Sequence, residues 1–237
     1  MSILNGRKIR EKDEIQKNTL YRIEHATRQP IPFVEHQKEK NGKPAHKDYV
    51  DIYFDLKETQ YGLYGNEYRP EFLDKTAVKT ADILALCIDE TNHKFASYVF
   101  DVKESTNGSE TIYKALEQIQ SSIRFKNDII QYLNEYQEQA HIGVITGDYD
   151  KEKIKNEIDK IHDEIEKTKT ELQSLSSMPI AGKMRWQILK QEEKYRVLNE
   201  FYEQKMRFGE QTIPIEIRQM KSTDADYTYE LHVVIDG

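Results

Sequence analysis

The chain has 237 residues, of which 37% are hydrophobic and 32% are charged, and its formal net charge at pH 7 is −7. This length accommodates one sizeable α/β domain with an appendage, or two small domains, and the apolar residues fall in periodic runs that exclude a disordered chain. The single cysteine, Cys87, excludes both a disulfide framework and a cysteine zinc site.

The sequence predicts a cytoplasmic protein without membrane contact. Its first residues become charged too early for a signal peptide, and no apolar run approaches the roughly 18 residues that a membrane span requires. Residues 51–150 hold nine Lys and Arg against eighteen Asp and Glu, whereas residues 1–50 hold eleven against seven. This acidity argues against a free-standing, high-affinity nucleic-acid binder, because phosphate neutralisation requires a basic surface.

The N-terminal part of the chain predicts one helix and one strand. Residues 7–25 place Ile and Leu at helical spacing, and Pro30 and Pro32 are expected to close the element. Residues 48–56 alternate aromatic and β-branched side chains with aspartates, which is typical of a strand with one solvated face. The Gly- and Tyr-rich residues 60–72 are interpreted as a loop.

Two further strands, a helix and a last strand complete the first half. Residues 80–89 and 94–103 have the apolar runs of strands, and the polar residues 90–93 between them predict a hairpin turn. A long amphipathic helix is expected to begin near Ser109, and the short apolar run at 141–147 fits a buried strand.

The C-terminal part has a different pattern. Apolar residues recur three and four positions apart over 151–175, with charged residues between them, which predicts a solvated helix of coiled-coil type. Residues 176–182 interrupt this pattern and a second helical run covers 183–208, so the two should form an antiparallel helical hairpin. Alternating residues at 212–220 and 227–235 predict a β-hairpin.

These elements together predict an α/β fold with a mixed sheet. We divide the chain into a core at residues 1–150, a helical hairpin insertion at 151–210, and a C-terminal β-hairpin at 211–237 that completes the sheet. The core reads, in order, as helix, three strands, helix and strand.

Three charged residues in the core have a spacing that indicates a metal-dependent catalytic site. Asp101 and Lys103 are two apart on one strand and therefore share a face. Asp82 lies near the start of the preceding strand, so an antiparallel hairpin would bring it opposite Asp101, with roughly 5 Å between β-carbons. Two aspartates can hold Mg²⁺ or Mn²⁺, and Lys103 could then orient or deprotonate a water, or neutralise negative charge in a transition state.

In these residues the chain resembles the PD-(D/E)xK nuclease superfamily, which includes many restriction endonucleases, Holliday-junction resolvases and antiviral effector nucleases. Asp82 matches the first acid of the motif, and Asp101-Val102-Lys103 matches (D/E)xK. The order of elements is similar to the restriction-endonuclease-like core of that superfamily, αβββαβ. Ala81 stands where the family has proline, and the third position is the less frequent Asp.

The resemblance also implies two further site residues. The helix after the motif often supplies a polar residue to the site, and Gln118 stands where that residue is usually found. Many members carry another acid on the first helix, and both Glu14 and Glu24 are candidates for that position.

The resemblance implies a metal-dependent endodeoxyribonuclease in restriction or anti-phage defence. Mg²⁺ or Mn²⁺ would be held by Asp82 and Asp101, and Lys103 would be the catalytic amine. DNA is the expected substrate, and RNA stays open. Because the chain is acidic, we expect help from a partner subunit, such as an ATPase or a nucleic-acid sensor, or from a homodimer formed through the helical hairpin.

The same residues have simpler interpretations. Asp101 and Lys103 could end an edge strand whose charges reach solvent, and Gln118 could be an ordinary exposed helix residue. Glu104 should face away from the other two, which favours a solvated role. The alternative function is a non-enzymatic interaction subunit that docks a partner through residues 151–208.

Overall fold

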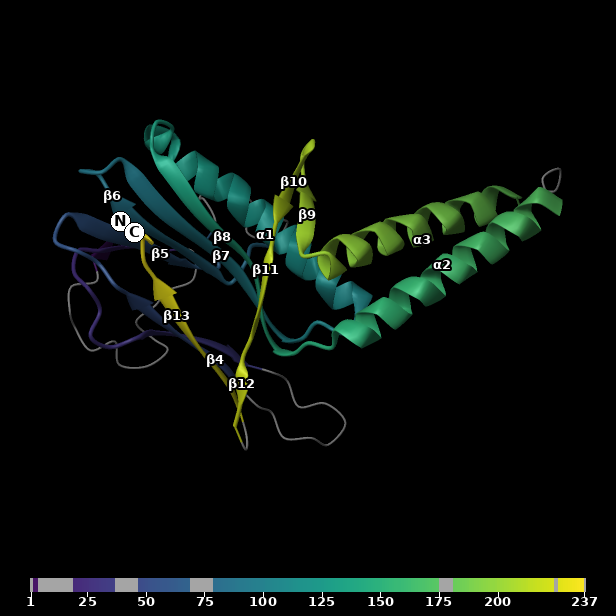
Figure 1. Ribbon diagram of the computed structural model, residues 1–237, viewed down its shortest axis with the longest axis horizontal. Helices are drawn as coiled ribbons and strands as arrows, with labels where there is room; N and C mark the ends of the chain where they lie inside the picture. The colour runs from purple at the N-terminus through teal and green to yellow at the C-terminus, as the bar shows by residue number, and fades with distance from the viewer. Residues whose placement is uncertain are drawn as a thin grey trace. The chain divides into compact units, whose positions relative to one another are not determined.

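The computed structural model describes residues 2–3, 19–36, 47–68, 79–174, 181–223 and 226–236 (Figure 1). The chain divides into two compact units. The first comprises Met1–Glu104, Ala115–Asp148 and Glu216–Gly237, and the second comprises Ser105–Lys114 and Tyr149–Ile215. The protein is thus a mixed α/β chain.

The first unit contains two β-sheets. The larger one has the order β1-β2-β5-β6-β7-β8-β11, and the smaller one has the order β12-β13-β4-β3. The strands of the larger sheet are β1 (Ser2–Ile3), β2 (Leu20–Ile23), β5 (Gln60–Asn66), β6 (Ile83–Asp89), β7 (Lys94–Ser105), β8 (Gln137–Asp148) and β11 (Glu216–Gln219). Those of the smaller sheet are β3 (Ile31–His36), β4 (Lys47–Phe54), β12 (Lys221–Ser222) and β13 (Tyr227–Val233).

Strand β6 is buried on both of its faces. Ile83, Ala85 and Cys87 belong to an apolar core that also contains residues of the smaller sheet, so the two sheets pack face to face. Leu86 and Ile88 lie in a second apolar cluster on the opposite face. Burial on both faces explains why this segment has a continuous apolar run instead of alternation.

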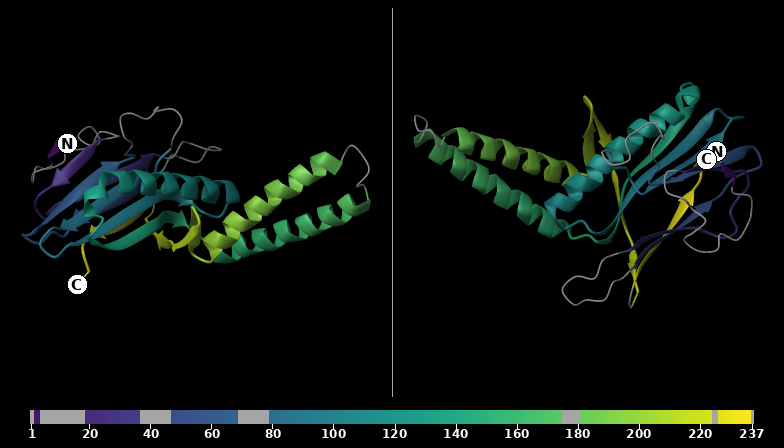
Figure 2. Two further views of the ribbon diagram at one scale, coloured as in Figure 1. Left: turned by 90° about the horizontal axis from the view of Figure 1, so that it is seen from above. Right: turned by 180° about the vertical axis from the view of Figure 1, so that it is seen from behind.

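Helix α1 (Ser109–Ile129) follows the hairpin of β6 and β7. Its residues 115–129 run along one face of the larger sheet (Figure 2), with Ala115, Ile119 and Ile123 buried. The short 3₁₀-helix η1 (Gln131–Leu133) then leads into β8, which lies beside β7. The helix and the strands predicted at 80–89, 94–103 and 141–147 are therefore present.

The predicted first helix is wrong where the structure describes it. Residues Leu20–Ile23 form β2, which pairs antiparallel with β5, and residues 4–18 lie outside the described residues. Tyr21 and Ile23 are buried, and the guanidinium of Arg22 lies over the Tyr61 ring. Buried side chains alternate along these four residues, as in a strand. Four residues are too few for this alternation to be distinguished from the helical spacing across 7–25.

β3 and β5 are two of the strands that were not expected from the sequence. β3 was missed because of Pro30 and Pro32, yet β3 is the last strand of the smaller sheet, where a residue without an N–H is tolerated. β5 was interpreted as a loop because of its glycines. A Cβ at Gly62 would lie 2.5 Å from ring atoms of Phe54, so this glycine permits close packing and does not make a turn.

The strand predicted at 48–56 exists as β4, but it has a different place in the fold. It pairs with β3 and β13 in the smaller sheet. The antiparallel neighbour of β6 is β5, so β5, β6 and β7 form the three-stranded meander.

The second unit contains α2 (Lys151–Ser174), α3 (Ala181–Tyr202) and the antiparallel pair of β9 (Lys205–Phe208) and β10 (Gln211–Pro214). The two helices form the predicted antiparallel hairpin, as the Lys194–Glu157 and Lys169–Glu192 ion pairs show. Buried residues of α2 recur at the expected spacing, at Ile154, Ile158, Ile161 and Ile165.

The second helix is shorter than predicted. It ends at Tyr202, and residues 205–208 form β9. Gln204 adopts a left-handed backbone conformation, with φ of 55°, and its N–H donates to the carbonyl of Phe201. This is a common way for a helix to stop, and Met206 continues the helical apolar spacing only by coincidence.

The predicted C-terminal β-hairpin is largely wrong. Residues 212–220 divide into β10, which pairs with β9, and β11, which pairs parallel with β8. β13 pairs parallel with β4. Only β12 pairs antiparallel with the start of β13. Pro214 lacks an N–H and stands where the chain leaves one strand pair for another.

None of the helices in the described ranges combines the length and apolar character needed to cross a lipid bilayer.

Candidate active site

Asp82, Asp101 and Lys103 meet at one end of the β6–β7 hairpin. Asp82 directly precedes β6, and the pairing of Ile83 with Phe100 places it opposite Asp101 in register. The N–H of Val102 donates to Oδ2 of Asp82 at 2.7 Å, which ties the first carboxylate to the second strand. The antiparallel hairpin predicted from the sequence therefore brings these side chains together.

Lys103 links the two carboxylates. Its Nζ lies 2.5 Å from Oδ2 of Asp101 and 4.0 Å from Oδ2 of Asp82. The Asp101 side chain is fully buried, whereas the Lys103 side chain is 21% exposed. The carboxylates therefore lie inside the protein, and the amine lies between them and solvent.

The charges at this site are not balanced. Burial raises the pKa of Asp101 well above its ordinary value of 3.8, the charge of Asp82 raises it further, and Lys103 lowers it. Burial also raises the pKa of Asp82, against the opposing effects of Lys103 and of the Val102 N–H. One ammonium cannot neutralise two buried carboxylates, so a proton or another cation is needed.

The donor set fits a divalent cation. Oδ1 of Asp101 is buried and receives no hydrogen bond from a donor in the described residues, although the two carboxyls lie close enough to share a proton. Mg²⁺ and Mn²⁺ prefer carboxylate oxygens, and Mg²⁺ keeps several water ligands. In the described part of the chain, no cluster of three or more His, Cys, Asp or Glu residues could hold a metal. Waters or substrate oxygens would have to complete the coordination.

Gln118 contacts the backbone that precedes Asp82. Its side-chain Nε2 donates to the backbone carbonyl of Thr80 at 3.0 Å, and the backbone carbonyl of Gln118 accepts from the N–H of Ala81. Ser122, one turn further along α1, accepts from the same N–H through Oγ at 2.8 Å. Helix α1 therefore positions Asp82 through its backbone, and Gln118 does so without contacting the carboxylates. Sequence reasoning missed Ser122.

Glu67 is an acid near Asp82 that the sequence did not indicate. Its N–H donates to the carbonyl of Asp82 at 3.0 Å, and its charge raises the pKa of Asp82. Glu67 has a left-handed backbone, with φ of 44°. Glu67 directly follows β5. Because the sequence predicts a loop for that segment, no pattern indicates that Glu67 lies beside Asp82.

The two acids expected from the first helix have different outcomes. Glu14 lies outside the described residues. Glu24 follows β2, is exposed, and has an ion pair of 3.8 Å with Arg22. Within the described ranges, Glu67 is the acid outside the predicted set whose charge raises the pKa of Asp82.

Comparisons of the chain with protein-family models, with curated proteins and with solved structures found no match.

Proposed function

We propose that this chain is a metal-dependent nuclease of the PD-(D/E)xK kind that hydrolyses phosphodiester bonds of DNA. The observation that carries the proposal is the convergence of Asp82, Asp101 and Lys103, with a buried Asp101 oxygen that has no N–H or hydroxyl donor in the described part of the chain. A charged edge strand does not explain this arrangement, because Asp101 has no exposed surface.

The order of elements gives further support. β5, β6 and β7 form an antiparallel meander, α1 follows, and β8 then lies beside β7. Three strands, a helix and a strand in this order are similar to the restriction-endonuclease-like core. The first strand of this meander is β5, whereas the sequence predicts residues 48–56 for that strand.

The residues of the site have separable roles. Asp82 and Asp101 would hold a divalent ion, which when bound polarises the scissile phosphate and lowers the pKa of a water. The Lys103 ammonium, at the exposed edge, would bind a phosphate oxygen and neutralise charge that develops during the reaction. Gln118 and Ser122 hold the backbone of residues 80–81 and so set the position of Asp82.

The test is cleavage of DNA by variants of these residues. Asp82→Asn, Asp101→Asn and Lys103→Met should each reduce metal-dependent cleavage by about 100-fold or more, with the fold kept by circular dichroism. Asp128→Asn and Lys94→Met are matched controls, since Asp128 is exposed on α1 and Lys94 lies at the opposite end of β7. Cleavage at the wild-type rate by the first three variants would exclude this site as the catalytic one.

Metal binding gives a second readout of the same site. Mn²⁺ titrated into the protein and followed by electron paramagnetic resonance should bind to the wild type and to Lys103→Met. Binding should be lost in Asp82→Asn and Asp101→Asn, because each removes an oxygen ligand. Assays with single-stranded and duplex RNA would separate DNA from RNA as substrate.

A docking role for the helical hairpin is the second candidate function. Trp186 and Leu189 are exposed on α3, at 57% and 63%, which favours an intermolecular contact there. In a purely non-enzymatic interaction subunit, Asp101→Ala and Lys103→Ala would keep activity in cells. A proline at Ile161, which breaks α2, would abolish it. A nuclease that works with a partner subunit, in restriction or anti-phage defence, would lose activity in both cases.

A further inference from the structure

The first turns of α3 present an exposed face that is both basic and aromatic. Residues 181–190 contain three cations, Lys183, Arg185 and Lys190, and no acidic residue. Lys183, Trp186 and Lys190 are three and four positions apart and share one side of the helix, with Leu189 beside them. Arg185 lies on the other side of Leu189, about 160° around the helix from Lys183. We call these five exposed residues, which together span about half of the helix surface, the α3 basic face.

The opposite side of α3 is already in use. Met184 and Ile188 are buried, as are the isoleucines of α2 that face them across the hairpin. The apolar stripe of α3 is therefore buried within the helical hairpin. Trp186 and Leu189 remain outside it.

The charges of the α3 basic face are uncompensated. Within the described residues, Lys183, Arg185 and Lys190 have no carboxylate at ion-pair distance, and the Lys190 ammonium lies 3.6 Å from the centroid of the Trp186 ring. In α2, by contrast, six lysines are interspersed with seven acidic residues.

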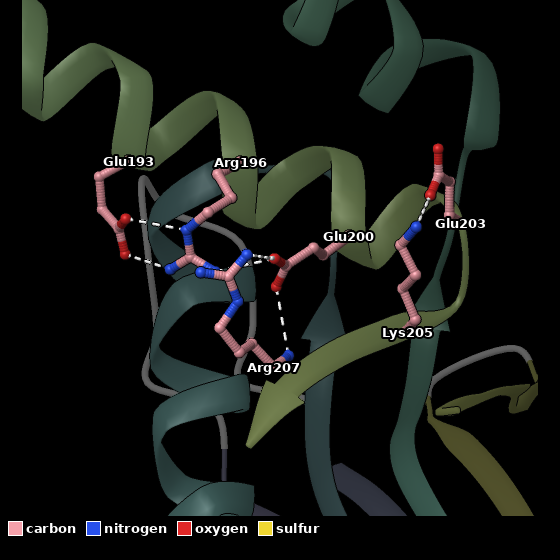
Figure 3. A network of polar contacts seen from close by, with 6 residues as sticks. All are labelled: Glu193, Arg196, Glu200, Glu203, Lys205 and Arg207. Atoms are coloured by element: carbon pink, nitrogen blue, oxygen red, sulfur yellow. Dashed lines mark hydrogen bonds and ion pairs between the residues drawn. The ribbon is translucent and has the colours of Figure 1, made fainter. Parts of the chain in front are cut away.

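In the second half of α3, by contrast, the cations are paired with carboxylates. Figure 3 shows Arg196 bound by Glu193 on one side and by Glu200 on the other, with Arg207 of β9 also approaching Glu200. Lys205 pairs with Glu203 next to them. The uncompensated charge is thus confined to the first half of the helix.

We propose that the α3 basic face binds the phosphate backbone of duplex DNA. This inference rests on the proposed nuclease function and names the surface that holds its substrate. Lys183 and Lys190 are seven residues apart, about 10 Å of helix, while a DNA strand offers a phosphate about every 3.4 Å along its axis. Lys183 and Lys190 can therefore each reach a phosphate of one strand, and Trp186 and Leu189 can pack against the sugars beside them. Arg185 lies further round the helix, beyond Leu189, where its long side chain can reach a phosphate at the edge of the contact.

Two other occupants fit the α3 basic face less well. A helix that lies on a membrane inserts a broad apolar face, and that face of α3 is buried against α2. A second copy of the chain meeting this face by two-fold symmetry would bring three unpaired cations against three more. A polyanion is the complementary partner, and duplex DNA is the one that the active site would require.

The test compares two variants with the same change in net charge. Variant A is Lys183→Ala/Arg185→Ala/Lys190→Ala, and variant B is Lys155→Ala/Lys160→Ala/Lys167→Ala, which removes three exposed lysines of α2. Binding to a short fluorescent DNA duplex is measured by anisotropy in EDTA, so that cleavage does not contribute. Variant A should bind about 10-fold or more weakly, and its dependence of log K on log salt should be shallower by about 2 to 3. Variant B should bind like the wild type.

Several results would overturn the inference. These are equal binding by variants A and B, no duplex binding by the wild type at low salt, and tighter binding to duplex RNA of the same sequence than to DNA. Another is a loss in variant A of binding to phosphatidylserine vesicles or of self-association in sedimentation, without loss of DNA binding. If instead Asp82→Asn and Asp101→Asn cleave normally while variant A loses DNA binding, the proposed active site fails and the DNA-binding face stands.

A kinetic split separates binding from chemistry. Variant A should raise the KM for duplex DNA and leave kcat at saturating DNA unchanged, because no residue of the α3 basic face belongs to the catalytic set. A fall in kcat with unchanged KM would contradict a role in substrate binding.

Discussion

Asp101 has no exposed surface, and its carboxyl shares the ammonium of Lys103 with Asp82. The desolvation free energy of two buried carboxylates is larger than the stabilisation from one ion pair. A second cation is therefore needed to offset it. Such a site lowers the stability of the metal-free protein, and metal binding should restore it. The same arrangement that favours a divalent ion therefore makes stability depend on pH.

The pH dependence has a definite sign. Because the folded-state pKa of Asp101 is raised above 3.8, its stabilising contribution is complete below that pH and is lost as pH rises through the folded pKa. In EDTA, Asp101→Asn should therefore gain stability relative to the wild type between about pH 5 and pH 8, by on the order of 1–3 kcal/mol at the upper end. Urea unfolding measures this difference.

Metal provides the control for this prediction. Mg²⁺ should restore the stability of the wild type at high pH and leave Asp101→Asn unaffected, because only the wild type keeps both oxygen ligands. Asp128→Asn, which changes an exposed carboxylate, should show no such pH trend. A constant difference between wild type and Asp101→Asn at every pH would show that the buried charge is compensated.

Ser122 allows a separate test of positioning. Ser122→Ala removes the side-chain acceptor from the N–H of Ala81 and should cost about 1 kcal/mol. It should lower kcat more than it changes KM, because the displaced backbone carries Asp82. Ser121→Ala is the matched control, since the Ser121 hydroxyl donates to the helix carbonyl of Glu117, away from the segment that carries Asp82. Equal effects of the two changes on kcat would remove Ser122 from the site.

At the level of elements, the helical hairpin depends on one apolar stripe on each helix. Ile161 is 4% exposed on α2, in the middle of the stripe that faces α3. The ion pairs of this unit are largely exposed, and pairs of that kind contribute about 0–1 kcal/mol each. Apolar burial therefore provides most of the stability of the hairpin.

Substitution at Ile161 tests this balance. Ile161→Ala should destabilise the second unit by about 2–5 kcal/mol. Arg196→Met, which removes the Arg196 ion pairs with Glu193 and Glu200 drawn in Figure 3, should cost no more than about 1 kcal/mol. Thermal unfolding followed by circular dichroism distinguishes the two. A larger loss from Arg196→Met than from Ile161→Ala would mean that ion pairs within α3 stabilise the unit more than its apolar stripe does.

At the scale of the whole molecule, the C-terminal residues complete both sheets of the first unit. β11 pairs with β8 in the larger sheet, and β13 pairs with β4 in the smaller one. Leu231 and Val233 of β13 are fully buried in the core between the sheets. Long-range pairings of this kind make folding of the unit depend on residues far apart in the chain.

A pair of neighbours on β13 tests this dependence. Leu231→Ala should destabilise the protein by about 2–5 kcal/mol, since it removes packing from a fully buried position. Glu230→Ala, at the adjacent exposed position, should change stability by no more than about 0.5 kcal/mol. Similar unfolding midpoints for the two variants would show that β13 contributes little to the core.

Local patterns explain why part of the fold was predictable. The β6–β7 hairpin is joined by a short polar turn, so the register that sets Asp82 opposite Asp101 follows from adjacent residues. The α2–α3 hairpin repeats its apolar spacing over many turns, which makes the helical period unmistakable. Cys87 lies in the apolar run of β6 and is buried as a core residue.

The remaining features depend on distant partners. The glycines of β5 are explained only by the Phe54 ring that packs on Gly62, and residues 20–23 are a strand because β5 offers them hydrogen bonds. The contacts of Glu67 and Ser122 with the segment around Asp82 likewise join residues far apart in sequence.

The sequence by itself determined the elements whose hydrogen bonds and apolar stripes close between neighbouring residues, together with the two aspartates and the lysine that one hairpin brings together. Only the tertiary structure decided which strands lie side by side, which acid stands near Asp82, and where the C-terminal strands insert. The physical reason is that a strand, unlike a helix, finds its hydrogen-bond partners outside itself, so its identity depends on the rest of the sheet.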